Sequence, residues 1–162
     1  MRRRTANGLT LALATAGLLI AGYLTLLHYD SSVPLVCSAG SFVNCETVLT
    51  SPSATFAGVP VAVWGLAWFG VALGLAALLL RAEAGDDATT LRTVSRAWTA
   101  AGVIGVLYLV YQEVGVVGKI CAWCTAVHLV VLAMVIVQSV DARDERFEPR
   151  PQLDENRIDE RS

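Results

Sequence analysis

Four cysteines carry the reactive chemistry of this 162-residue chain, and they occur as two pairs. Cys121 and Cys124 form a C-x-x-C motif, whereas Cys37 and Cys45 lie eight residues apart. An even number of cysteines outside the cytoplasm indicates disulfides, which are either static staples or reactive pairs. A zinc site is a weaker interpretation, because the two spacings are unequal and no soluble fold supports them. We therefore expect no metal.

The elements that position these cysteines are membrane helices. Hydrophobic residues make up 55% of the chain, mean hydropathy is +0.58, and only 16% of residues are charged. A membrane-spanning helix needs about 20 mainly apolar residues, and nearly charge-free stretches predict such helices at about 9–27, 59–80, 97–117 and 120–140. We predict an all-α integral membrane protein, with a four-transmembrane-helix bundle in residues 1–141 and a disordered cytoplasmic tail in residues 142–162. No basic run suggests nucleic acid.

The basic residues predict the orientation, because Lys and Arg are kept on the cytoplasmic side of a membrane. All eleven arginines fall before the first helix, between the second and third, or after the fourth. Lys119 is the single basic residue in the other connections. Both termini are therefore expected in the cytoplasm and all four cysteines on the outer side. A cleaved signal peptide is the alternative interpretation of the first helix.

The outer segment 28–58 is too apolar for a solvated loop, and we expect it to fold over the bundle as a cap. Asn44 is a plausible N-cap for a short helix over 45–50, ahead of Ser51-Pro52. The inner segment 81–96 contains Gly85-Asp86-Asp87 and is predicted to be a plain connector.

The start of the fourth helix is suited to thiol chemistry. Residues i and i+3 share a helical face, so the sulfurs of Cys121 and Cys124 can meet. Unpaired N–H groups and the helix dipole stabilise a thiolate in the first turn. We expect Cys37 and Cys45 to form a mobile, water-facing pair and Cys121 and Cys124 a pair at the membrane boundary. This arrangement favours an electron relay over two static staples.

The chain resembles the bacterial vitamin K epoxide reductase family over about residues 8–140. Four features carry the resemblance: the loop cysteine pair after the first helix, Cys45-Glu-Thr-Val-Leu-Thr-Ser51 followed by Gly58-Val-Pro60 and Trp64-Gly65, the Tyr108/Tyr111 segment, and Cys121-Ala-Trp-Cys124 opening the fourth helix. The resemblance implies a bundle around a quinone pocket. It also implies that Cys37 and Cys45 meet a thioredoxin-like partner, that Cys121 exchanges with one of them, and that Cys124 reduces the quinone. It leaves open which loop cysteine exchanges with Cys121.

The implied activity is that of a quinone-dependent, disulfide-generating oxidoreductase of the bacterial inner membrane, with its active site on the extracytoplasmic face. The electron donor is a separate extracytoplasmic thioredoxin-like protein of DsbA type, because no thioredoxin-like domain follows the fourth helix. The acceptor is a membrane quinone, either menaquinone or ubiquinone. Reduction of vitamin K quinone or epoxide proper, a DsbB-type protein, and a non-enzymatic protein with structural disulfides are the alternatives. The C-x-x-C at the last helix disfavours the DsbB type.

Residues beyond the cysteines supply the expected quinone contacts. His128 lies four residues after Cys124, where the vertebrate enzymes have a tyrosine, and their second-helix asparagine has no counterpart here. These departures disfavour epoxide reduction. The candidate quinone contacts are His128, Trp123, Tyr111, Val61 and Trp64. Glu113 is interpreted as an interfacial carboxylate that snorkels to water, with proton delivery or support of the C-x-x-C turn as the alternative.

Overall fold

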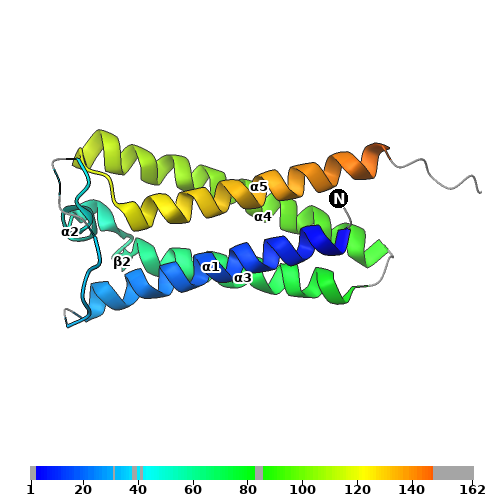
Figure 1. Ribbon diagram of the computed structural model, residues 1–162, viewed down its shortest axis with the longest axis horizontal. Coiled ribbons are helices and arrows are strands. Elements are labelled where there is room, and N and C mark those ends of the chain that lie inside the picture. Colours follow the sequence, from blue (N-terminus) through cyan, green and yellow to red (C-terminus); the bar gives the residue numbers. More distant parts are fainter. Residues whose placement is uncertain (1–2, 31, 38–39, 41, 83–85, 148–162) are drawn as a thin grey trace, which may run out of the picture.

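The structure is a computed structural model that describes residues 3–30, 32–37, 40, 42–82 and 86–147. Four long helices lie side by side along its length (Figure 1). They are α1 (Arg3–Tyr29), α3 (Val61–Arg81), α4 (Asp86–Tyr111) and α5 (Ala122–Phe147). All four are long and apolar enough to cross a membrane. Because α1 and α4 each pack against both α3 and α5, the helices close into a bundle, as predicted.

Two predicted boundaries differ from the structure. The segment 81–96 is not a plain connector, because α4 already begins at Asp86. Acidic residues favour a helix N-terminus, and Ala88 and Ser95 bury their side chains, which gives these polar turns a packed face. At the other end of the chain, α5 extends to Phe147, beyond the predicted boundary at residue 141. The rest of the predicted tail lies outside the described residues.

Small residues let α1 approach its neighbours closely. Its buried positions recur at intervals of three or four residues: Ala6, Thr10, Ala14, Gly17, Ala21 and Leu24. Phe69 of α3 is buried against this face, and its ring occupies the space that a Cβ on Gly17 would need. Small residues at helix contacts are typical of membrane bundles, where close backbone approach stabilises the packing. α1 is therefore packed as an integral part of the bundle.

The segment between α1 and α3 forms the predicted cap at one end of the bundle (Figure 1). It contains the short helix α2 (Cys45–Leu49), a single turn of 3-10 helix, η1 (Pro52–Ala54), and the two-residue strands β1 (Thr55–Phe56) and β2 (Val59–Pro60). Asn44 caps α2 as predicted, since its side-chain oxygen accepts the Thr47 N–H at 3.0 Å.

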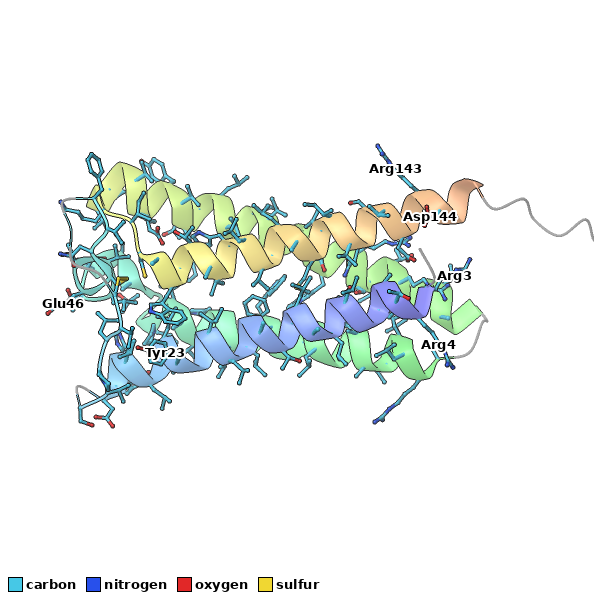
Figure 2. The ribbon with its side chains drawn as sticks, in the orientation of Figure 1. Arg3, Arg4, Tyr23, Glu46, Arg143 and Asp144 are labelled. Carbon is cyan, nitrogen blue, oxygen red and sulfur yellow. A yellow bond between two sulfur atoms is a disulfide. The ribbon has the colours of Figure 1, made fainter. Side chains whose placement is uncertain are left out.

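Charged side chains gather at the end opposite the cap. Arg3, Arg4 and Arg143 lie there, while Glu46 and Tyr23 lie at the cap end (Figure 2). In this half of the bundle, α4 and α5 are joined by the ion pair between Arg96 and Asp141, whose nearest atoms are 3.3 Å apart. The basic end and the cysteine-containing cap are thus separated by the full length of the bundle.

Candidate functional site: a four-cysteine cluster beneath the cap

The cap brings all four cysteines into one cluster. Cys45 and Cys121 are buried together with Val48, at 1% and 0% exposure, and Cys37 and Cys124 pack against them. Cys37 and Cys45 form a disulfide, while Cys121 and Cys124 are free. The expected water-facing pair is therefore asymmetric, because Cys37 is half-buried and Cys45 is enclosed. Of these two disulfide-bonded cysteines, Cys37 is the more exposed.

A short piece of parallel backbone pairing places Cys45 beside Cys121. Val43 and Ile120 form the bridge, in which the Ile120 N–H donates to Phe42 O at 3.0 Å and the Asn44 N–H donates to Ile120 O at 3.1 Å. Cys121 directly follows Ile120, and Cys45 lies two residues after Val43. The pairing thus brings the first residue of α2 next to the residue that precedes α5.

Cys121 caps the α5 helix through its sulfur. It stands immediately before the helix, and its Sγ accepts a hydrogen bond from the Cys124 N–H at 3.4 Å, as a Ser or Thr oxygen does at an N-cap. The hydrogen bond from the Cys124 side chain lowers the pKa of the Cys121 thiol, against the opposing effect of burial. Cys121 is therefore the cysteine of this pair that is better suited to exist as a thiolate.

Two side chains hold the extended segment before Cys37. The Tyr23 hydroxyl donates to Pro34 O at 2.9 Å and accepts the Val36 N–H at 3.2 Å. Trp123 donates its ring N–H to Val36 O at 2.8 Å, and its ring packs against Tyr23. The segment that carries Cys37 is therefore fixed to α1 and α5.

Glu113 was missed as a site residue by the main sequence interpretation. It does not snorkel to water, because it is only 7% exposed and lies on η2 (Gln112–Val117), a π-helical continuation of α4. Its Oε2 accepts the Cys121 N–H at 3.5 Å, and its carboxylate lies within hydrogen-bonding reach of the Cys124 thiol. The signal in the sequence was a single carboxylate in an apolar helix. The direction of the Glu113 side chain depends on the π-helical turn, and the local sequence pattern does not reveal that turn.

One cavity lies beside the cysteine cluster, and a second lies deeper between the helices. The smaller one, about 60 Å³, lies between the cap and the end of α4, and Glu113 and Cys124 are in its wall. The larger one, about 380 Å³, lies between α3, α4 and α5, and its wall is mainly apolar, with Trp64, Trp68 and Trp98. Val127, one helical turn after Cys124, lines this second cavity. The cavity therefore reaches the helix that carries the C-x-x-C motif.

The predicted quinone contacts fall in different places. Trp64 lines the larger cavity and donates to Phe56 O at 3.3 Å. His128 is buried one turn after Cys124, at 6% exposure, and Trp123 binds the cap. Tyr111, at the end of α4, is 64% exposed, and Val61 is the first residue of α3. Neither of the two cavities has one of these last four residues in its wall.

Comparison with protein families identifies the kind of protein that carries the cluster. The model described as the vitamin K epoxide reductase family matches residues 9–139, which include all four cysteines, the whole of α3 and α4, and most of α1 and α5. The chain belongs to this family. A comparison with curated proteins gave no significant match. Members of the vitamin K epoxide reductase family are quinone-linked thiol oxidoreductases, so the cluster belongs to an oxidoreductase.

The larger cavity fits the quinone that the family uses. Its wall is apolar, as a flat hydrophobic ring and its apolar substituents require. The Trp68 ring N–H in that wall is buried and has no hydrogen-bond partner among the described residues. An unpaired buried donor costs free energy, and a quinone carbonyl is an acceptor that can satisfy it.

Proposed function

We propose that the protein oxidises an extracytoplasmic thioredoxin-like partner of DsbA type and passes the electrons to a membrane quinone. The observation that carries this proposal is the asymmetric cluster: a half-buried Cys37, an enclosed Cys45 in one buried cluster with Cys121, and a free Cys124 in the wall of the smaller cavity. Two purely structural disulfides would not require all four cysteines to lie in one cluster. Each step of the relay follows from the position of one cysteine.

Electrons enter at Cys37. A thiolate of the reduced partner attacks the Cys37 sulfur of the Cys37–Cys45 disulfide, and the Cys45 thiolate leaves. The second thiol of the partner then displaces Cys37, which leaves the partner oxidised and both loop cysteines reduced. Cys37 is the point of attack because it is half-buried, whereas Cys45 is enclosed.

Electrons cross to the helix pair through Cys45 and Cys121. When Cys121 and Cys124 are joined as a disulfide, the Cys45 thiolate attacks Cys121, a Cys45–Cys121 bond forms, and Cys124 leaves. Cys37 then displaces Cys121 and restores the Cys37–Cys45 disulfide. The shared burial of Cys45 and Cys121 supports this choice of exchange partners.

Electrons leave from the reduced Cys121–Cys124 pair. Closing that disulfide again releases two electrons and two protons, and the quinone, when bound, accepts both and becomes a quinol. Trp64, Trp68 and Trp98 would hold the apolar body of the quinone, and Val127 continues this wall toward Cys124. His128 is proposed as a polar contact, with Trp123, Tyr111 and Val61 as outer neighbours.

The proposed location is the bacterial inner membrane, with both termini in the cytoplasm and the cap outside. The arginines at the end opposite the cap support this orientation, since basic residues stay on the cytoplasmic side. The proposed acceptor is menaquinone or ubiquinone.

The test is a coupled reaction with purified protein, reduced DsbA-type protein and a short-chain quinone. We expect partner oxidation and quinol formation in equal amounts. Cys124→Ala should abolish quinol formation, while the control Thr50→Ala, at an exposed position of the cap, should retain it. Quinol formation that survives Cys124→Ala would contradict the proposal. A Cys37–Cys45 disulfide that the partner cannot reduce would instead identify a staple.

A further inference from the structure

Glu113 is a buried carboxylate in contact with both helix-pair cysteines. Its Oε2 accepts the Cys121 N–H, and the Cys124 thiol lies within hydrogen-bonding reach of the carboxylate. Glu113 and Cys124 also share the wall of the smaller cavity beneath the cap. A general base must lie within hydrogen-bonding reach of the proton that it takes, and Glu113 meets this condition for Cys124.

The π-helical turn fixes where this carboxylate lies. The N–H groups of Gly118 and Lys119 both donate to the Glu113 carbonyl oxygen, at the C-terminal end of η2. Gly118 has a φ of 67°, a left-handed conformation that glycine adopts without strain. Single π-helical turns are frequent at functional sites, because the wider turn changes the direction of a side chain. Here the turn directs Glu113 to the start of α5.

Two thiols are among the titratable groups that interact with Glu113. Cys121 and Cys124 both interact with its charge, and Lys119 follows in the turn after η2. The residues of α2 and η1 that line the shared cavity are Val48, Leu49, Ser51, Ser53 and Ala54, which carry no charge. The carboxylate is therefore placed to exchange a proton with a thiol.

We propose that Glu113 is a catalytic residue that accepts the thiol proton of Cys124 during reoxidation of the helix pair. The inference rests on the proposed function. As the Cys124 S–H bond breaks, its proton moves to the Glu113 carboxylate, and the electron pair stays on sulfur. The Cys121–Cys124 bond then forms with loss of two electrons to the quinone. The proton on Glu113 and the one lost from Cys121 complete the quinol.

A merely structural role makes a different prediction. If Glu113 only accepts the Cys121 N–H, the Glu113→Gln variant should behave like the wild type, because the glutamine amide oxygen is also an acceptor. If Glu113 takes a proton, Glu113→Gln should fail, whereas Glu113→Asp should retain part of the function. Glu46→Gln, at an exposed carboxylate on α2, is the matched control.

The experiment measures alkylation of Cys124 by a small uncharged reagent without quinone, in the full-length protein with the Cys37–Cys45 disulfide intact. Peptide mass spectrometry reads the modification between about pH 6 and 8. In the wild type and Glu46→Gln, the Cys124 rate should change less than about twofold, because thiol and carboxylate share one proton. In Glu113→Gln the rate of Cys124 alkylation should rise about tenfold per pH unit, because the thiol proton of Cys124 must then be lost to water.

A second measurement follows a single turnover with a short-chain quinone. Glu113→Gln should slow quinol formation about a hundredfold, and Glu113→Asp should recover part of the loss. The proposal is wrong if Glu113→Gln keeps the wild-type pH profile. The proposal is also wrong if the rate of Cys124 alkylation in the wild type rises about tenfold per pH unit. This measurement tests the proposal even when a variant does not fold. If the pH profile of Cys124 alkylation depends on Glu113 but the protein does not reduce quinone, the proposed function is wrong. The role of Glu113 as a proton acceptor would not be contradicted by that result.

Discussion

Cys45 and Cys121 belong to one buried cluster, and each stands at the start of a helix close to the same backbone bridge. Neither helix alone positions the two sulfurs, because the bridge joins segments that are far apart in the sequence. The cap is thus held by backbone pairing at the point where thiol exchange has to occur.

This arrangement predicts which mixed disulfide forms. In the double variant Cys37→Ser/Cys124→Ser, mild oxidation should join Cys45 to Cys121. In Cys45→Ser/Cys124→Ser, the bond between Cys37 and Cys121 should form with a yield lower by on the order of tenfold, since a disulfide requires a narrow range of Cα distances. Non-reducing peptide mapping measures both yields. Equal yields in the two variants would mean that the cap does not select Cys45.

The Tyr23 hydroxyl predicts a second, local effect. Tyr23→Phe removes the group that binds both Pro34 O and Val36 N–H. Losing a hydrogen bond of about 1 kcal/mol should accelerate amide hydrogen exchange at residues 35–37 about fivefold. Tyr29→Phe is the control, because Tyr29 lies on the same helix and is 70% exposed. Equal protection of this segment in both variants would show that Tyr23 does not hold it.

The sequence predicted features that depend on local pattern. The four helices follow from apolar length, and the Asn44 cap follows from a side chain that binds an amide three residues later. The sequence did not predict that Cys45 is enclosed while Cys37 stays accessible, because this depends on the pairing of Val43 with Ile120. Local patterns carry no information about such long-range pairing.

The inner turns of α4 and the position of Glu113 were missed for related reasons. Polar composition suggested a connector at 81–96, but buried contacts of Ala88 and Ser95 stabilise a helix there. An acidic residue near a helix end suggested exposure, but the π-helical turn directs Glu113 inward. In both cases tertiary packing decides a structure that composition leaves open.

The glycine at the contact of α1 and α3 predicts a stability effect. A Cβ at Gly17 would overlap the ring of Phe69, which is fully buried and cannot move aside. Gly17→Ala should therefore destabilise the bundle by about 1–3 kcal/mol, as overpacking does. Gly8→Ala is the control on the same helix, because no atom lies within 4 Å of its added Cβ. Thermal unfolding in detergent compares the two, and an equal loss in both would contradict the close contact.

The hydrogen bond between the helix-pair thiols predicts the pH dependence of Cys121. Donation from the Cys124 side chain stabilises the Cys121 thiolate, so the pKa of Cys121 lies below its ordinary value and the thiolate persists to lower pH. Alkylation of Cys121 in the protein with this pair reduced should therefore have its midpoint below about 8.5, the value of a free cysteine. Cys124→Ala removes the donor and should raise the midpoint, whereas Cys124→Ser keeps a hydroxyl donor and should retain most of the shift. Peptide mass spectrometry across a pH series measures all three midpoints. A midpoint that is the same in Cys124→Ala and in the wild type would show that the Cys124 side chain does not stabilise the thiolate.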